Sequence, residues 1–404
     1  MERVPCLRVS QCHAQQLRRC LQSTGALDLS LSLLKDSDET VLLPISPSCL
    51  PHLDLLSLRT SLASDGTFEI VWSQSPLQSK KVRTGANKLE NVLRELLESR
   101  GETWTEELRG DLPRSFQRHG DLLLLGERCF SLPLWKKMAF SPLDQQLWSA
   151  VARGLGAKRL AKMSRISRDG FRSPVVTMLV GEHSWVKHVD NGISYEFDVT
   201  RCMFSAGNIT EKLRVAGFDC RGETVVDLYA GIGYFTLPYL VHAGASRVHA
   251  CEWNPDAVQA LQKNLEANGV SDRCTVHQGD NRQLQLCDIA DRVNLGLVPS
   301  SEDGWPVACR LLNRTAGGIL HLHQNVTSSP PGAIAGAAAR GTSGRRADRE
   351  AWRAWADHAA GRIAALLEEV TGARWTTNAR RVEGVKSYAP RVHHVVLDLE
   401  CRPS

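Results

Sequence analysis

Residues 227–281 contain glycine, acidic and amide side chains of the types and spacing that bind a nucleoside. The ordered set is Asp227, Gly231, Gly233, Glu252, Asp280 and Asn281. Glycines in a turn after a strand let the backbone approach a ligand, and an acidic residue at the tip of the next strand accepts hydrogen bonds from ribose hydroxyls. Glu252 follows Gly233 by 19 residues, close to the ~20-residue spacing of that contact. The set therefore predicts a ribose site.

The glycine turn favours S-adenosylmethionine (SAM) over a dinucleotide. A dinucleotide fingerprint has a third glycine three residues after the second, and Thr236 occupies that position here. The run D-L-Y-A-G-I-G-Y-F fits SAM sites better, because SAM has no pyrophosphate. Asp227 then supports either the methionyl amine or the glycine turn. A doubly wound domain whose turn binds nothing is the alternative.

A strand–turn–helix–strand unit positions these residues. Apolar, β-branched residues 224–227 predict the first strand, residues 234–242 a helix and residues 247–251 the second strand. Further strands, covering helices and a terminal hairpin follow. We therefore predict an α/β fold, a seven-stranded SAM-dependent transferase (Rossmann-like) domain, accompanied by a smaller α+β domain and an accessory N-terminal region.

The chain divides by pattern into three regions. Residues 1–110 are rich in serine and leucine and predict an accessory N-terminal region with one helix at 87–99. Residues 111–204 predict an α+β domain whose 184–199 segment is a hairpin around an Asn-Gly turn. Residues 205–402 form the transferase domain, in which the Ala/Gly/Arg-rich stretch 330–349 is predicted to be a flexible insertion.

The most basic stretch of the chain lies in the second region. Its cations are Arg153, Lys158, Arg159, Lys162, Arg165, Arg168 and Arg172. Such a run is often only a solvated face. Beside a SAM domain, contact with an RNA backbone is the better interpretation, because phosphate neutralisation supplies most sequence-independent affinity.

Composition narrows the class of protein. The chain has 404 residues and a formal net charge of +5, which permits an anionic partner without demonstrating one. No apolar run reaches the ~20 residues of a membrane span, and the amino terminus lacks the apolar core of a signal peptide. The twelve cysteines contain no C-x-x-C pair, which favours reduced thiols in a cytoplasmic protein over disulfides or a zinc site.

From residue 111 to residue 401 the sequence resembles the eukaryotic tRNA wybutosine-synthesising protein 2 family, relatives of the tRNA guanine-N1 methyltransferases. The matching motifs are DLPRSFQRHGDLLLL, HVDNGISYEFDVTRCMFSAGNITEKLRVA, VDLYAGIGYFTLP, HACEWNP, GDNR, DRVNLGLVPSSEDGWP, HLHQNV and VKSYAPRVHHVVLDLEC. The first hundred residues and the Ala/Gly/Arg-rich stretch depart from the family pattern, and neither departure touches a motif.

The resemblance implies transfer of the 3-amino-3-carboxypropyl group of SAM to 4-demethylwyosine, 3′ of the anticodon in tRNA(Phe), with release of 5′-methylthioadenosine. The implied partner is the anticodon arm of tRNA(Phe), and the implied protein is a monomer that uses neither a metal nor a membrane. The family's cofactor residues carry over onto Ser205, Lys212, Glu252, Asp280 and Asn281.

Each of these side chains has a physical role. Glu252 accepts from ribose hydroxyls, Asp280 can accept from the adenine amine, and Asn281 can donate as well as accept. Lys212 offers a point charge for the carboxylate of SAM, and Ser205 offers a donor beside it. Spacing alone would make Lys212 a surface helix lysine.

The chemistry leaves three hypotheses open. A sulfonium has three carbons open to attack, and the site chooses among them by orientation. Residues 294–301, NLGLVPSS, lack the Asn/Asp-Pro-Pro-aromatic loop of amine methyltransferases. The hypotheses are an aminocarboxypropyltransferase, a SAM-dependent tRNA guanine methyltransferase and a non-catalytic RNA-binding module. His321 and His323, predicted to point to opposite layers, are interpreted as packing residues rather than metal ligands.

Overall fold

The computed structural model places the described residues in two compact units, each considered by itself. The described residues are 4–10, 14, 17–18, 21–22, 26–28, 31, 34–36, 40–47, 49–50, 53, 68–73, 85–139, 144–167, 171–204, 206–328 and 343–404. The first unit comprises Met1–Leu112 and Phe130–Lys158, and the second comprises Pro113–Cys129 and Arg159–Ser404. The predicted α/β class with an accessory N-terminal region is confirmed.

The first unit contains a small antiparallel sheet and a group of helices. The sheet has the order β2-β3-β1-β4, and Leu7, Leu43 and Ile45 lie in its buried core. Its strands are β1 Val4–Ser10, β2 Leu34–Lys35, β3 Thr40–Pro44 and β4 Phe68–Ser73. The helices are α4 Gly85–Glu98, α5 Glu106–Gly110, α6 Pro133–Ala139 and α7 Asp144–Gly154.

The second unit begins with a four-stranded sheet and a hairpin. The sheet has the order β5-β6-β7-β8, with β5 Phe116–His119, β6 Leu122–Leu125, β7 Arg159–Ile166 and β8 Pro174–Val180. The hairpin joins β9 Trp185–Asp190 to β10 Ile193–Asp198. Asn191 and Gly192 have φ of 50° and 76°, the positive values that a tight primed turn requires. The predicted Asn-Gly turn is confirmed.

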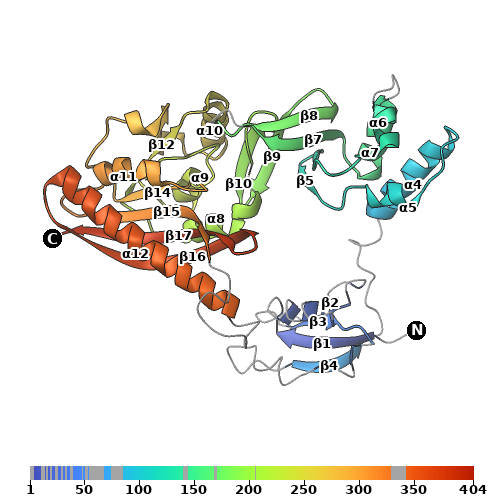
Figure 1. Ribbon diagram of the computed structural model, residues 1–404, viewed down its shortest axis with the longest axis horizontal. Helices are drawn as coiled ribbons and strands as arrows, with labels where there is room; N and C mark the ends of the chain where they lie inside the picture. The colour runs from blue at the N-terminus through green and yellow to red at the C-terminus, as the bar shows by residue number, and fades with distance from the viewer. Residues whose placement is uncertain are drawn as a thin grey trace. The chain divides into compact units, whose positions relative to one another are not determined.

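A seven-stranded sheet forms the body of the second unit (Figure 1). Its order is β13-β12-β11-β14-β15-β17-β16, parallel from β13 to β15 and antiparallel for the last two strands. The strands are β11 Thr224–Asp227, β12 Arg247–Glu252, β13 Cys274–Gln278, β14 Arg292–Leu295, β15 Gly318–Thr327, β16 Trp375–Ala389 and β17 Val392–Pro403. The predicted seven-stranded transferase sheet with a terminal hairpin is confirmed.

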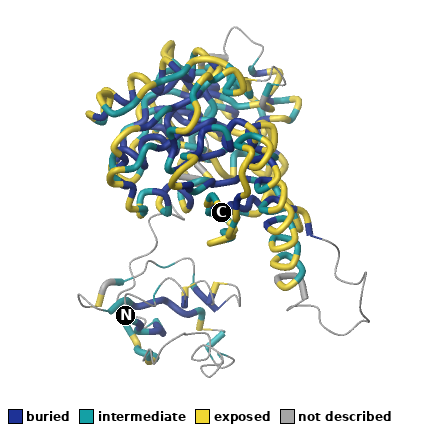
Figure 2. The backbone as a smooth tube through the Cα atoms, turned by 90° about the vertical axis from the view of Figure 1, so that its left-hand side faces the viewer, coloured by how far each residue is buried: buried dark blue, intermediate teal, exposed yellow. Residues whose placement is uncertain are grey.

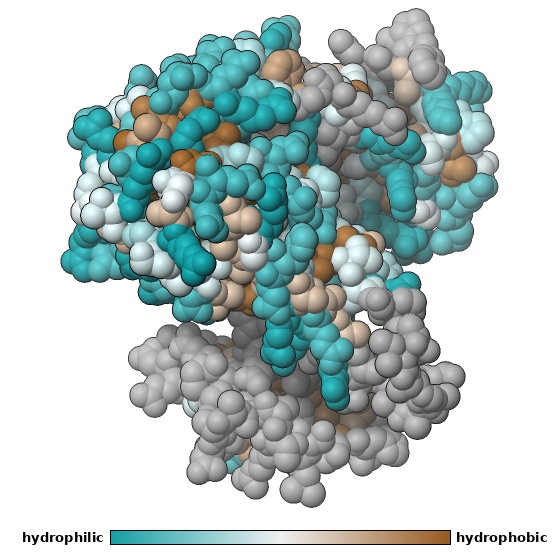
Figure 3. Space-filling view, turned by 60° about the vertical axis from the view of Figure 1, so that its left-hand side comes forward, coloured by the Kyte–Doolittle hydropathy of each residue, from teal (hydrophilic) through white to brown (hydrophobic). Residues whose placement is uncertain are grey.

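Helices cover both faces of this sheet because successive strand side chains alternate between the faces. Val225 packs with α8 Ile209–Ala216, α9 Thr236–Val241 and α10 Pro255–Ala267. Val226, the next residue, packs with α11 Trp305–Leu311 and α12 Ser343–Thr371. Figure 2 shows the strands buried between helices whose outer sides are exposed. On the side of the molecule that Figure 3 shows, hydrophilic side chains cover most of the described surface, and apolar side chains gather in small patches.

Two predicted boundaries differ from the structure. Helices α6 and α7, assigned by sequence to the 111–204 domain, belong to the first unit instead. Helix α7 packs against α4, and α6 packs against α7. Gly154 of α7 lies so close to Leu89 of α4 that a Cβ at this glycine would meet the Leu89 Cα at 2.8 Å. Helix α12 starts at Ser343, so residues 343–349 of the predicted insertion are helical, and residues 330–342 lie outside the described residues.

Candidate functional site

A cavity of about 710 Å³ opens at the carboxyl ends of the parallel strands. One side, which we call the sheet wall, consists of the lining residues that follow β11 to β14, within 228–235, 251–257, 279–282 and 296–303. The other side, which we call the facing wall, comes from β5 to β8, residues 197–208 and β16. Its lining residues are Gln117, His119, Leu124, Met163, Ser164, Phe171, Arg172, Pro174, Phe197, Val199, Cys202, Met203, Phe204, Asn208, Lys386 and Tyr388. Ligands of open α/β sheets bind at this edge.

The two glycines of the turn have different tasks. Gly231 lines the cavity at φ 56°, where its backbone can approach a ligand. Gly233 does not line it. Its φ is 103°, and a Cβ there would meet Leu237 and Leu261 at 3.0–3.1 Å. Gly233 therefore gives the close helix packing that a third glycine gives in dinucleotide sites.

Asp227 supports the turn from beneath. It is fully buried, and its carboxylate accepts hydrogen bonds from Thr236 Oγ1 at 2.8 Å and Asn294 Nδ2 at 2.9 Å. Burial raises the pKa of Asp227, and these two bonds oppose that rise. Because Asp227 does not line the cavity, the geometry favours support of the glycine turn over contact with a methionyl amine.

Glu252 lies at the end of β12 and lines the cavity. Its Oε2 accepts from the Gly231 amide at 2.8 Å, and its Oε1 accepts from the Asn254 amide at 2.9 Å. Each carboxylate oxygen can accept more than one hydrogen bond, so both retain capacity for ribose hydroxyls. Burial raises the pKa of Glu252, and the backbone donors counter that rise. The carboxylate is therefore held in one orientation.

Asp280 and Asn281 also line the cavity. Asp280 forms a two-pronged ion pair with Arg282, at 2.6 Å for the closest contact, and this bond lowers the pKa of Asp280. Asn281 donates from Nδ2 to the carbonyl of Leu228 at 2.7 Å. Both side chains are thus positioned by neighbours, and each keeps oxygen lone pairs that can face a nucleobase.

Lys212 has a different environment from the one that its predicted role suggests. It is 3% exposed, is absent from the lining of the cavity, and forms an ion pair with Asp190 of the β9–β10 turn. Its ammonium also lies 5.4 Å from the ring centroid of Phe204, which does line the cavity. Ser205, the second residue predicted near the carboxylate of SAM, lies outside the described residues.

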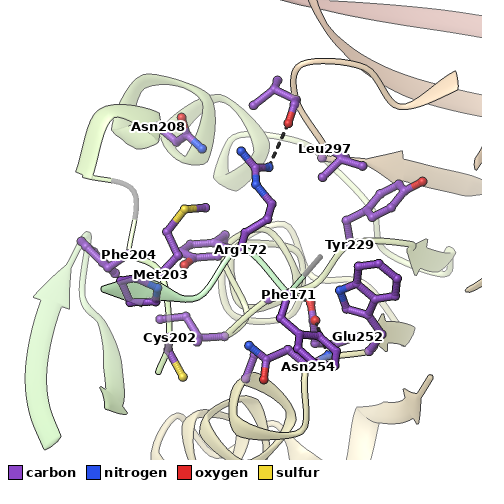
Figure 4. Close-up of a pocket in the computed structure, with 18 of the residues that line it drawn as sticks. Phe171, Arg172, Cys202, Met203, Phe204, Asn208, Tyr229, Glu252, Asn254 and Leu297 are labelled. Atoms are coloured by element: carbon purple, nitrogen blue, oxygen red, sulfur yellow. Dashed lines mark hydrogen bonds between the residues drawn. The ribbon is translucent and has the colours of Figure 1, made fainter. Parts of the chain in front are cut away.

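Several lining residues were not singled out from the sequence. The rings of Phe171 and Trp253 pack edge to face with their centroids 5.7 Å apart, and each residue is 45% exposed. Arg172 donates a hydrogen bond to the carbonyl of Val298 at 2.8 Å, and Figure 4 draws this bond as a dashed line. In the same view Asn208 lies on one side of Arg172 and Tyr229 lies on the other. Trp253 directly follows Glu252 in the HACEWNP motif, and this adjacency could have predicted that Trp253 lines the cavity.

On the facing wall, His119 and Asn208 carry buried polar atoms that have no hydrogen-bond partner among the described residues. His119 is 2% exposed, and neither ring nitrogen has a hydrogen-bond partner. The centroid of its ring lies 5.2–5.4 Å from the ring centroids of His188, Phe197 and Phe204. Burial lowers the pKa of His119 to about 4. The Oδ1 of Asn208 is also buried and unpartnered. Such atoms are costly unless a ligand satisfies them.

The basic run is partly structural. Arg159 pairs with Asp121 and donates to the carbonyls of His183 and Trp185. Lys162 donates to the carbonyl of Cys129. Arg165 is exposed, Arg172 faces the cavity, and Arg168 lies outside the described residues. The run is therefore not one uniform surface.

The histidines of β15, His321 and His323, are buried, and the expectation that they point to opposite layers is wrong. Residues two apart on a strand face the same side, and His321 and His323 both pack against the α8–α9 side. His321 lies 2.6 Å from Asp398 and 2.9 Å from Arg292, and His323 lies 3.0 Å from His394. Within the described part of the chain, no three His, Cys, Asp or Glu residues cluster as metal ligands.

The sequence matches three family models along most of its length. They are a TYW2 N-terminal domain at residues 7–82, a second TYW2 N-terminal domain at 93–184 and the TRM5/TYW2 methyltransferase domain at 186–331. The tRNA wybutosine-synthesizing protein 2 homolog of Danio rerio is 57% identical over 412 residues, 100% of both chains. The homolog of Homo sapiens is 50% identical over 418 residues, covering 96% of this chain and 92% of its own.

Solved structures agree with the fold. Pyrococcus horikoshii TYW2, solved in complex with MeSAdo, is 29% identical with a TM-score of 0.57, over 78% of this chain and 100% of its own. Trm5b from Pyrococcus abyssi is 21% identical with a TM-score of 0.56, over 99% of each chain, and this likeness concerns the fold alone. None of the described helices is both long and apolar enough to cross a membrane.

Proposed function

The chain belongs to the tRNA wybutosine-synthesising protein 2 family of SAM-dependent transferases, and on that premise we propose that it transfers the 3-amino-3-carboxypropyl group of SAM to 4-demethylwyosine, 3′ of the anticodon in tRNA(Phe). The observation that carries the proposal is the cavity itself. It joins a fixed carboxylate, Glu252, to a second wall with unsatisfied polar groups. The relative solved with MeSAdo supports the same reaction, since that thioether is what remains of SAM after the transfer.

The transfer balances without an acid or a metal. A nucleophilic atom of the base forms a bond to the γ-carbon of the methionyl arm, and the bond from that carbon to sulfur breaks. Its electron pair stays on sulfur, so the positive sulfonium becomes neutral 5′-methylthioadenosine, and the alkylated nucleobase loses a proton to solvent water. The protein's contribution is orientation, because placing one carbon in line with the base and shielding the others selects the product.

The lining residues divide this task. Glu252 binds the ribose hydroxyls, and Asp280 and Asn281 bind the adenine. Gly231 lets the backbone approach the nucleoside, while Asp227 and Gly233 hold the turn. Lys212 forms an ion pair with Asp190 and supports the ring of Phe204, so its effect on the amino-acid arm is indirect. Ser205 keeps the role that the family resemblance implies, as a hydrogen-bond donor beside the amino-acid arm.

The proposed partner is the anticodon arm of tRNA(Phe). Exposed aromatic rings at the cavity, Phe171, Trp253 and Tyr388, are the kind of surface on which unstacked bases of RNA stack. Exposed Arg165 is suited to the phosphate backbone. We propose a monomer that works in the cytoplasm. Buried cysteines such as Cys251, Cys309 and Cys401 are free thiols, which supports a reducing compartment.

Doubly labelled SAM tests the reaction. We would incubate the protein with tRNA(Phe) bearing 4-demethylwyosine and with SAM that carries one isotope in the methyl group and another in the carboxyl group. The proposal expects the carboxyl label in the tRNA and the methyl label in methylthioadenosine. Glu252→Ala serves as the control that should lower both signals together.

The competing functions give different label patterns. A SAM-dependent tRNA guanine methyltransferase would move the methyl label into tRNA and release S-adenosylhomocysteine. An RNA-binding module would bind tRNA and transfer neither label. Either pattern would contradict the proposed reaction.

A further inference from the structure

The cavity needs a partner for the two charges of the amino-acid arm, and Lys212 is already engaged. Its ammonium is paired with Asp190 behind the facing wall. The α-carboxylate and α-ammonium of SAM form a zwitterion, which requires a cation and an acceptor within reach of each other. Two lining residues of the facing wall, Asn208 and Lys386, carry groups of these two kinds.

Asn208 supplies the acceptor. It ends the 3-10 helix η2 Ala206–Asn208 and is the N-cap residue of α8, yet its side chain makes no capping hydrogen bond. Its Oδ1 is buried, has no hydrogen-bond partner among the residues that the structure describes, and belongs to a residue that lines the cavity. An amide oxygen in this state loses its bonds to water without replacement. A ligand ammonium would satisfy it with a charge-assisted hydrogen bond.

Lys386 supplies the cation. It projects from β16, lines the cavity and packs against the backbone next to Asn208, since a Cβ at Gly207 would meet its Nζ at 2.7 Å. Among the described residues no carboxylate pairs with Lys386, and its ammonium lies 4.5 Å from the ring centroid of Tyr388. The other cations of the lining are engaged, Arg282 by Asp280 and Arg172 by the carbonyl of Val298.

We propose that Asn208 and Lys386 form the subsite for the aminocarboxypropyl arm of SAM, with Lys386 binding the carboxylate and Asn208 accepting from the ammonium. This inference rests on the proposed function and adds residues to it. In Figure 4 Asn208 lies across the cavity from Glu252, so an arm held there extends away from a ribose held at Glu252. The arm would thus be presented at the facing wall, where it can meet the base.

Calorimetry with three ligands separates the arm from the adenosine. SAM has the whole arm, decarboxylated SAM lacks only the carboxylate, and 5′-methylthioadenosine lacks the arm. Lys386→Met should weaken SAM binding at least tenfold, the loss of a charged hydrogen-bond partner, and should leave methylthioadenosine within twofold of wild type. The variant should bind decarboxylated SAM as wild type does, because only the carboxylate contact is removed.

Asn208→Leu tests the proposed contact with the α-ammonium of SAM. It should weaken SAM and decarboxylated SAM alike, by about fivefold to tenfold, and leave methylthioadenosine unchanged. Lys386→Arg, which keeps the charge, should recover most of the SAM affinity. Lys263→Met is the matched control, because Lys263 also lies over an aromatic ring, Trp185 at 4.0 Å, but is absent from the lining.

The outcomes that would overturn the inference are distinct. Equal losses for SAM and methylthioadenosine would mean that Lys386 shapes the site rather than binds the arm. Unchanged SAM affinity with weaker tRNA binding would assign Lys386 to an RNA phosphate. Should Lys386→Met fail to fold, Lys386→Gln replaces it, and unchanged methylthioadenosine binding certifies the fold. Wild-type protein that cannot bind SAM would instead refute the proposed function.

Discussion

The two walls of the cavity differ in how their polar groups are satisfied. On the sheet wall, Glu252 accepts from two backbone amides and Asp280 pairs with Arg282. On the facing wall, the ring nitrogens of His119 and the Oδ1 of Asn208 have no hydrogen-bond partner within the described part of the chain. The sheet wall is therefore preorganised for a nucleoside, whereas the facing wall gains its missing hydrogen bonds when a ligand arrives. The comparison separates a fixed anchor from a surface that depends on its ligand.

The largest expected effect lies behind the facing wall, at the ion pair of buried Lys212 with partly buried Asp190. Lys212→Met should lower the free energy of unfolding by about 3–5 kcal/mol, because it leaves Asp190 without its counter-charge. Urea unfolding measures the loss. The double variant with Asp190→Asn should recover much of it. A stable Lys212→Met protein that no longer binds SAM would instead show direct contact between Lys212 and the ligand, and would break the distinction between the walls.

Glu252→Ala should remove the anchor of the sheet wall. We expect SAM binding to weaken by about 1.5–3 kcal/mol, as for loss of a charged hydrogen-bond partner. Because Glu252 faces the ribose, methylthioadenosine should lose the same amount in calorimetry. A loss confined to SAM, with the fold intact, would remove Glu252 from the ribose site.

The next effect concerns acid stability of the facing wall. The pKa of His119 is about 4 in the folded protein and ~6.5 in an unfolded chain. The unfolded state therefore binds its proton first as the pH falls, and stability is lost between pH 6.5 and 4. From pH 7 to pH 5 the wild type should lose about 2 kcal/mol more than His119→Phe, which keeps a ring among its aromatic neighbours.

That acid effect is measured by urea unfolding at the two pH values. His394, whose pKa is also about 4, remains in both proteins and cancels in the comparison. Identical pH dependence in wild type and His119→Phe would mean that the ring of His119 is not held neutral and unpartnered.

The difference between the walls also explains what the sequence could predict. Gly231, Glu252, Asp280 and Asn281 follow successive strands of one sheet, so strand pattern and spacing bring them together, and the structure places all four in the lining. His119, Asn208 and Lys386 come from three distant segments, and their proximity depends on tertiary packing that no local pattern encodes. The engagement of Lys212 by Asp190 was missed for the same reason, since the two are joined only by the packing of α8 against the β9–β10 turn.

The smallest expected effect is at the aromatic pair that joins the walls, Phe171 of the facing wall and Trp253 of the sheet wall. Edge-to-face rings contribute about 0.5–1.5 kcal/mol beyond burial, and the lower half of that range applies because both rings are about half exposed. A double-mutant cycle of Phe171→Leu and Trp253→Leu, read by urea unfolding, should give a coupling of that size. Zero coupling would mean that the two rings do not contact each other in solution. A coupling that appears only with SAM would tie the pair to the arm, and would move Trp253 from the anchor to the ligand-dependent surface.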